Sequence, residues 1–131
     1  MLSTALNDRK TSSRLLCVDD DPRFLMVFAA LLESAGYVVE ALSDPRLAVE
    51  LACRTAFDLV ILDYDMPHMN GAELACQLKE QKRDLPIVLF SGNPSPPAEA
   101  LNVIDAYVVK GQGIGSLLRT LNATVHAQAG S

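Results

Sequence analysis

Residues 57–63 read F-D-L-V-I-L-D, an apolar run that stops at a carboxylate. A short run of aliphatic residues without polar alternation is typical of a strand that is covered on both faces. Such strands occur in parallel sheets, where helices pack on each side. The stretch therefore predicts a buried parallel strand whose carboxyl end carries Asp63.

Comparable apolar runs recur along the chain, with amphipathic segments between them. Strands are predicted over 14–19, 37–42, 57–63, 86–90 and 106–110, and helices over 22–35, 43–54, 71–82 and 115–126. Pro22 suits the first position of its helix and Gly36 the position after its end. Alternating strands and helices predict an α/β fold, and five strands suit a doubly wound parallel sheet of order 2-1-3-4-5.

The composition is that of one acidic domain. The chain has 131 residues, of which 50% are hydrophobic, and a net charge of -5 without a run of Lys or Arg. The charge argues against direct nucleic-acid binding, and no apolar stretch is long enough to span a bilayer. The start lacks a secretion signal, so a cytoplasmic protein is expected. We expect a flexible tail over 1–13, the domain over 14–127 and a frayed end over 128–131.

The three cysteines, Cys17, Cys53 and Cys76, lie far apart and form no C-x-x-C pair. Each occurs in an apolar or helical context. They are expected to be buried free thiols, as in a reducing compartment.

Polar functional groups follow four of the five predicted strands. Asp19 and Asp20 end the first strand, Asp63 the third, Ser91 the fourth and Lys110 the fifth. Three carboxylates at the crevice between strands 1 and 3 make an anionic pocket that suits Mg2+, and no His or thiolate cluster favours zinc or copper. A lysine and a hydroxyl could hold phosphoryl oxygens, and a carboxylate can form an aspartyl phosphate. The pattern favours phosphoryl chemistry.

A third acid, Asp21, directly precedes Pro22. This position is the N-cap of the following helix, where a carboxylate accepts backbone N–H bonds and opposes the helix dipole. Asp21 is therefore expected to start a helix, whereas Asp19 and Asp20 serve the pocket.

Four segments carry a resemblance to a known family: C-V-D-D-D-P, D-L-V-I-L-D-Y-D-M-P-H-M-N-G, P-I-V-L-F-S-G and A-Y-V-V-K. They resemble the receiver domain of bacterial two-component response regulators, of the chemotaxis-receiver type, over roughly residues 14–127. The resemblance implies the flavodoxin-like form of the doubly wound fold.

The resemblance also implies a role for each site residue. Asp63 would accept the phosphoryl group, with Lys110 paired to the phosphate. Asp20 would bind Mg2+ directly, Asp19 through water, and Asp65 through its backbone carbonyl. Two further residues would form the switch, with a hydroxyl that moves onto the phosphoryl group and an aromatic ring that swings inward behind it: Ser91 and Tyr107.

The partners are likewise implied by the resemblance. A sensor histidine kinase or a histidine phosphotransfer protein would donate the phosphoryl group. The domain would catalyse its own phosphorylation and dephosphorylation without turning over a separate substrate. A downstream protein would read the surface of helix 4, strand 5 and helix 5, and receivers often form homodimers through the strand 5 region.

The chain departs from the family pattern in three places. Gly111 replaces the usual proline after Lys110, so a trans peptide bond is expected there. Prolines 94, 96 and 97 predict an irregular loop and a shortened helix 4 near 97–103. Asp65 and Asn93 occupy positions that border the attacking water in the family, where they tune the lifetime of the phosphoryl group. Asp65 would either orient that water or simply face solvent.

Other functions remain open at the level of sequence. D-Y-D at 63–65 resembles the motif of haloacid dehalogenase-type phosphatases, but here it follows the third strand and continues into M-P. A receiver-like interaction module that works without phosphorylation is the main alternative. The chain is expected to be a stand-alone regulator rather than a receiver excised from a longer protein.

Overall fold

The structure, a computed structural model, describes residues 13–129. It contains a parallel five-stranded sheet of order β2-β1-β3-β4-β5, as predicted. Its strands are β1 (Arg14–Val18), β2 (Val38–Leu42), β3 (Leu59–Leu62), β4 (Ile87–Ser91) and β5 (Ala106–Val109). Four α-helices connect or follow them: α2 (Pro22–Ser34), α3 (Ala48–Arg54), α4 (Gly71–Gln81) and α5 (Ile114–Ala129). The predicted tail falls outside the described residues except for residue 13, and so do residues 130–131 of the predicted frayed end.

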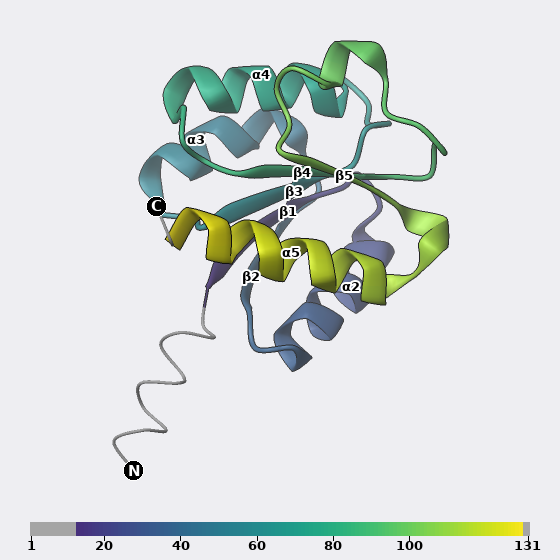
Figure 1. The fold of residues 1–131 in the computed structure, drawn as a ribbon. Coiled ribbons are helices and arrows are strands. Elements are labelled where there is room, and N and C mark those ends of the chain that lie inside the picture. Colours follow the sequence, from purple (N-terminus) through teal and green to yellow (C-terminus); the bar gives the residue numbers. More distant parts are fainter. Residues whose placement is uncertain (1–12, 130–131) are drawn as a thin grey trace.

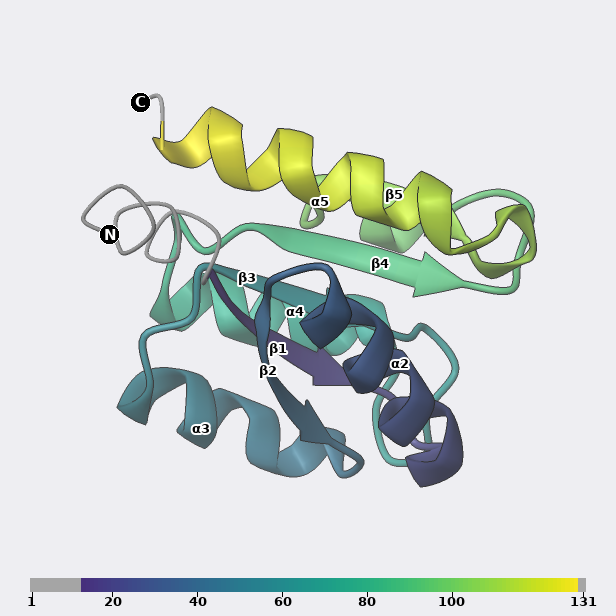
Figure 2. The same ribbon diagram turned by 90° about the horizontal axis from the view of Figure 1, so that it is seen from below.

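The helices form a layer on each face of the sheet (Figures 1 and 2). Helices α2 and α5 cover one face, and α3 and α4 cover the other. Each layer closes its own hydrophobic core. The core under α2 and α5 contains Leu15, Ile61, Phe90 and Leu117, whereas the core under α3 and α4 contains Leu16, Leu62, Leu74 and Leu89. Burial on both sides explains why the strands read as continuous apolar runs.

The helix predicted over 43–54 begins differently from the expectation. Residues Pro45–Leu47 form the 3-10 helix η1, and the α-helix starts at Ala48. The Asp44 carboxylate accepts the Arg46 N–H at 3.0 Å, and it also binds the Arg46 guanidinium. This local bond favours a tight turn at Pro45 before the chain becomes α-helical.

The connection between β4 and β5 has only a short helical element, as the prolines predict. After an irregular loop, Ala98–Ala100 form the 3-10 helix η2, and turns continue to Val103. Pro97 has φ -62° and ψ 141°, an extended conformation from which the 3-10 turn starts. The trans bond predicted between Lys110 and Gly111 is confirmed, since the described residues contain no cis peptide bond.

The expectation of three buried thiols is wrong for two of the cysteines. All three are free, but only Cys17, within β1, is buried, whereas Cys53 and Cys76 are exposed. Both exposed cysteines lie on outer faces of amphipathic helices, α3 and α4, where an apolar context in sequence does not mean burial in space. Within residues 13–129, no helix has the length and apolar character that crossing a membrane requires.

Candidate functional site

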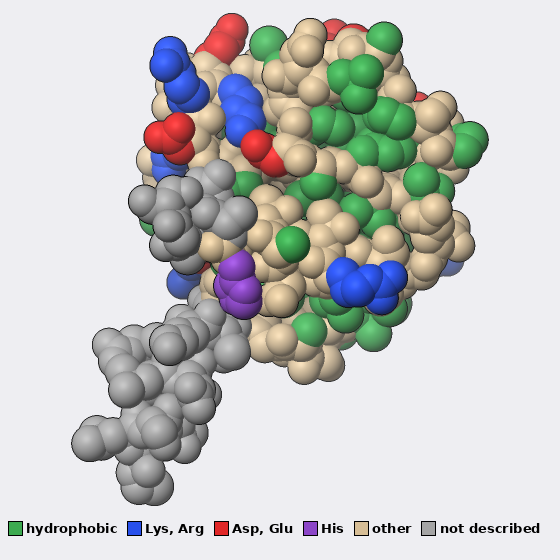
Figure 3. All heavy atoms as spheres, viewed as in Figure 1, with side chains coloured by type: hydrophobic (Ala, Val, Ile, Leu, Met, Phe, Trp, Pro, Cys, Tyr) green, Lys and Arg blue, Asp and Glu red, His purple; other side chains and the backbone are tan. Residues whose placement is uncertain are grey.

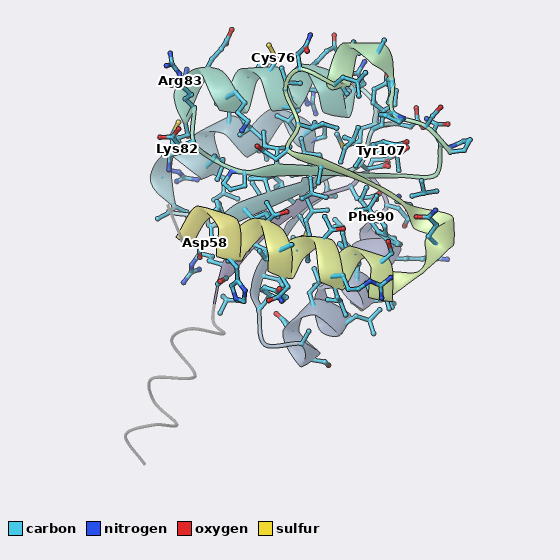
Figure 4. The ribbon with its side chains drawn as sticks, viewed as in Figure 1. Asp58, Cys76, Lys82, Arg83, Phe90 and Tyr107 are labelled. Carbon is cyan, nitrogen blue, oxygen red and sulfur yellow. The ribbon has the colours of Figure 1, made fainter. Side chains whose placement is uncertain are left out.

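Four strands deliver polar side chains to the carboxyl edge of the sheet. All pairings are parallel, so the strands end at one edge. Asp19 follows β1, Asp63 follows β3, Ser91 ends β4 and Lys110 follows β5. In Figure 4, Phe90 and Tyr107 lie toward this edge on opposite faces of the sheet, and Asp58, Lys82 and Arg83 lie at the other edge. The topology therefore brings these four residues to the same edge of the sheet.

Three carboxylates form the centre of the site. Asp19, Asp20 and Asp63 each offer a carboxylate oxygen, and these atoms all lie within 4.8 Å of one another. Asp19 is buried, Asp63 is half-buried and Asp20 is exposed. Oxygen-only donors that repel one another suit a hard divalent cation that keeps some of its water ligands. The trio could therefore hold a divalent metal ion, and its oxygen donors are those that Mg2+ accepts; binding of Mg2+ itself stays a prediction.

The neighbouring acid Asp21 lies outside this trio and caps α2. Its Oδ1 accepts the N–H of Arg23 at 3.0 Å and the N–H of Phe24 at 3.3 Å. The N–H of Asp21 in turn donates to Oδ1 of Asp19 at 3.0 Å. The predicted N-cap is confirmed, and the turn that it forms also orients the Asp19 carboxylate.

Lys110 joins two of the carboxylates. Its Nζ donates to Oδ2 of Asp19 at 3.0 Å and to Oδ1 of Asp63 at 3.3 Å. The Asp19 and Asp63 side chains are only 7% and 11% exposed, while that of Lys110 is 29% exposed. These contacts are therefore much less screened by water than surface ion pairs. One cation compensates part of the negative charge and leaves the site anionic.

The environment shifts the pKa of both Asp63 and Lys110. Burial and the nearby Asp19 charge raise the pKa of Asp63 to about 6, and Lys110 only partly opposes them. Burial acts to lower the pKa of Lys110, but its hydrogen bond to Asp19 and the two carboxylate charges outweigh burial, so this pKa is raised. Because its pKa is raised, a further cation near Asp63 would favour the ionised form of this carboxyl.

The loop from β3 to α4 fits closely against the backbone of Asp63. A Cβ added to Gly71 would lie 2.5 Å from the carbonyl oxygen of Asp63 and 2.7 Å from Cδ1 of Leu89. The Gly71 N–H also donates to the Tyr64 carbonyl at 2.8 Å. His68, in the middle of the loop, has a positive φ of 75°. The glycine of the M-P-H-M-N-G segment is thus required for α4 to start this near the site.

Ser91 and Tyr107 are both hydrogen-bonded to Asn93, in the loop that follows β4. Ser91 is fully buried, and its Oγ accepts the Asn93 N–H at 3.2 Å. The Tyr107 hydroxyl donates to the carbonyl of Asn93 at 2.7 Å and lies 3.2 Å from that of Ser95. The half-buried tyrosine ring therefore contacts the proline-containing loop through its hydroxyl rather than the acid trio. Asp65 is exposed, and its role as a metal ligand through the backbone carbonyl stays a prediction.

Two aromatic residues at the site were not predicted to have a role there. Phe24 and Phe90 lie against the Lys110 ammonium group, with ring centroids 4.6 and 5.9 Å from Nζ. In the sequence, Phe24 belongs to the apolar stripe of a helix and Phe90 to a strand, so core packing accounts for both. Nothing in the sequence pattern links either ring to Lys110, since Phe24 lies 86 positions and Phe90 lies 20 positions before it.

Comparison with known proteins identifies the family. Residues 15–122 match the response regulator receiver domain. The chain is 34% identical over 92 residues to the response regulator protein TodT of Pseudomonas putida, covering 70% of this chain and 40% of that protein. It is 35% identical over 109 residues to the two-component response regulator ARR12 of Arabidopsis thaliana, covering 82% of this chain and 17% of that protein. The chain thus spans less than half the length of these curated relatives.

Solved structures agree with the sequence match. Chemotaxis protein CheY4 of Vibrio cholerae superposes with a TM-score of 0.80 at 30% identity, covering 86% of this chain and 98% of that one. Response regulator protein TrrA of Thermotoga maritima, solved in complex with Mg(2+)-BeF, also gives a TM-score of 0.80, at 27% identity and the same coverage. The chain belongs to the CheY-like response regulator receiver domains of two-component systems.

Proposed function

We propose that this domain accepts a phosphoryl group on Asp63, with Mg2+ bound by the neighbouring acids, and that phosphorylation changes a protein-binding surface around β5. One observation carries the proposal: the half-buried Asp63 carboxylate lies in the acid trio with the Lys110 ammonium 3.3 Å from its Oδ1. A nucleophile, a cation and an all-oxygen metal site at one strand edge are the parts that phosphoryl transfer requires.

Asp63 would act as the nucleophile. At neutral pH a carboxyl with a pKa of about 6 is mostly ionised, so an oxygen is available to attack phosphorus. The donor would be a phosphohistidine of another protein. As the new O–P bond forms, the bond from phosphorus to the histidine nitrogen breaks, and its electron pair stays with the leaving imidazole. Lys110 is placed to donate an N–H bond to a phosphoryl oxygen, and the Ser91 hydroxyl could donate another.

Mg2+ would be held by Asp20 and Asp63, with Asp19 acting through water and the Asp65 carbonyl as a further ligand. When bound, it would supply charge neutralisation for the phosphoryl oxygens and relieve the repulsion among the carboxylates. TrrA, which was solved with Mg(2+)-BeF, has the same fold. The acid trio of this chain supplies the oxygen donors that such a cation requires.

The output would involve the segment between β4 and β5. Asn93 contacts Ser91 through its N–H and Tyr107 through its carbonyl, so movement at the site can reach the surface through one residue. Apolar side chains gather on the face of Figure 3 that lies over η2 and the adjoining loop. Leu101 is 57% exposed there. Because η2 is a single turn, the surface read by a downstream protein would be loop-based.

Receiver domains interact with histidine kinases. A sensor kinase or a histidine phosphotransfer protein would therefore be the donor, with a protein as the downstream target and a second copy of the domain as a possible partner. An interaction module that works without phosphorylation is the second candidate, because the 3-10 turn in place of helix 4 changes the usual switch surface.

The proposal is tested by incubating the purified protein with Mg2+ and acetyl phosphate. The mass of the intact protein then shows whether it has gained a phosphoryl group. We expect one phosphoryl group on the wild type and none on Asp63→Asn. Asp65→Asn is the matched control, since it removes an exposed acid two residues away and keeps the backbone carbonyl. It should still be labelled.

Two outcomes would contradict the proposal. An unlabelled wild-type protein, folded by circular dichroism, would favour the phosphorylation-independent module. Labelling that persists in Asp63→Asn would mean that another side chain is the acceptor.

A further inference from the structure

Lys110 lies where the backbone does little to fix its side chain. It begins the 3-10 turn η3 (Lys110–Gln112), and the next residue is Gly111. A Cβ at Gly111 would meet no atom within 4 Å, and Gly113 has a φ of 88°. The hydrogen bonds to Asp19 and Asp63 hold the ammonium group, and a further contact on its apolar side would restrain it more.

Two aromatic rings provide that contact. The Nζ of Lys110 lies 4.6 Å from the ring centroid of Phe24 and 5.9 Å from that of Phe90. Both distances are within the range over which the negative face of an aromatic ring attracts a cation. The rings come from different elements, the first turn of α2 and the end of β4, and their centroids lie 6.3 Å apart.

The two rings are themselves held in place by a third. Phe28 stacks on Phe24 at 5.1 Å and 19°, and on Phe90 at 5.4 Å and 17°. Phe28 and Phe90 are 4% and 5% exposed, and both belong to the core under α2 and α5. The lysine therefore contacts an aromatic cluster that is continuous with the core, and we call Phe24, Phe28 and Phe90 the aromatic cluster.

The cluster and the carboxylates act on the ammonium group in different ways. Carboxylate oxygens accept its N–H bonds, at 3.0 Å for Asp19 and 3.3 Å for Asp63. An aromatic face attracts the charge without offering a lone pair that competes strongly for those hydrogens. The rings and Lys110 also line an open pocket of about 170 Å³, but on the side of Asp19 and Asp63 the cavity that the rings line is only about 10 Å³. That volume holds at most one water molecule.

We propose that Phe24 and Phe90 are positioning residues that aim Lys110 at the acceptor carboxylate, with Phe28 as their support. The assignment rests on the proposed function, since the lysine is aimed at an oxygen that would receive the phosphoryl group. Phe24 carries more of the effect, because its ring is nearer to the Lys110 ammonium group than that of Phe90. Phe24 also lies in the first turn of α2, which Asp21 caps. The start of α2 thus orients both the Asp19 carboxylate and the Phe24 ring, and both contact Lys110.

The first test measures geometry alone and does not require phosphorylation. In the metal-free protein, the Cε protons of Lys110 should be shifted upfield in the NMR spectrum by the Phe24 ring current. Phe24→Leu should move them toward the random-coil position, whereas Phe24→Tyr should retain the upfield shift. Unshifted Cε protons in the wild type would overturn the proposal whatever the acetyl phosphate experiment shows.

The second test measures function in a double-mutant cycle. Phe24→Leu should slow phosphorylation of Asp63 by acetyl phosphate by about three- to tenfold, as expected for loss of a partly buried cation–π contact. Phe24→Tyr should restore most of the rate. In a Lys110→Met background, Phe24→Leu should have no further effect, because the group that it positions is gone.

Phe57→Leu is the matched control. Phe57 is a buried phenylalanine, whereas Phe24 is partly buried, and Phe57 belongs to the core on the opposite face of the sheet. It should lower stability without changing the rate at temperatures where the protein is folded. Equal slowing by Phe57→Leu and Phe24→Leu, or slowing by Phe24→Leu that persists without Lys110, would show that Phe24 acts only through packing.

Discussion

At the scale of single residues, three consecutive carboxylates have three environments. Asp19 is buried and bound to Lys110, Asp20 is exposed in the acid trio, and Asp21 caps α2. Identical side chains thus differ in function because the chain turns between them. Their charges are not interchangeable, and substitutions should separate them.

Asp20→Ala should weaken Mg2+ binding strongly, and Asp21→Ala should leave it nearly unchanged. Asp21→Ala should instead lower the free energy of unfolding by about 1 kcal/mol, because two backbone N–H groups at the start of α2 lose their acceptor. A Mg2+ titration and urea unfolding measure the two effects. Asp21→Asn is the control, since an amide oxygen can still cap the helix. Equal losses of Mg2+ affinity in the two alanine variants would mean that the acids are misassigned.

At the scale of elements, Lys79 and Asp105 form a cluster of hydrogen bonds at the amino edge of the sheet, which we call the clasp. Nζ of Lys79 on α4 donates to the Leu85 carbonyl at 2.7 Å and to Oδ2 of Asp105 at 2.9 Å. The same Asp105 oxygen accepts the N–H of Ile87, the first residue of β4, at 2.7 Å. This clasp joins α4, β4 and the segment before β5. It lies beside the connection between β4 and β5, which contains the 3-10 turn η2 instead of the full helix that is usual in the family.

Asp105→Ala should lower the free energy of unfolding by about 1–3 kcal/mol, because the Ile87 N–H loses its acceptor and the Lys79 ammonium loses its charged partner while keeping the Leu85 carbonyl. Asp84→Ala is the matched control, an exposed acid in the loop before β4. It should change stability by less than about 0.5 kcal/mol. Equal stability of the two variants in urea unfolding would mean that the clasp does not contribute.

The elements could largely be predicted from the sequence, but the contacts between them could not. Apolar runs and helical stripes predict the strand order, because each strand is covered on both faces and short crossovers leave few arrangements. The N-cap at Asp21 is local and is likewise predictable. The clasp at Asp105 and the aromatic contact of Lys110 join residues 26 and 86 positions apart, counting from Lys79 and from Phe24. Sequence periodicity carries no information on such pairs.

At the scale of the whole molecule, the two helical layers divide the cysteines by accessibility. Cys17 lies inside the sheet, and burial followed by the charge of Asp19 raises its pKa to about 12. Cys53 and Cys76 are exposed on the helices of one layer. The fold thus separates one inert thiol from two reactive ones.

A thiol reagent should therefore modify two cysteines in the native protein and a third only after unfolding. The slow modification of Cys17 should follow the opening of the sheet, because a protonated, buried thiol does not react. Mass spectrometry over time, with and without urea, measures the count. Cys17→Ala supplies the control, and it should abolish the slow phase. Rapid labelling of Cys17 in the native protein would contradict this burial.

The direction of the strands has a consequence for how this domain can be joined to others. Arg14 begins β1 at the amino edge of the sheet, and α5 runs back toward that edge from the carboxyl edge, where the acid trio lies. In Figure 1 the beginning of β1 and the end of α5 lie on the same side of the molecule, away from η3. A folded unit attached close to either of these two points would therefore lie away from the Asp63 carboxylate (Figure 1). The start of β1 and the end of α5 thus lie at the opposite edge of the sheet from the acid trio.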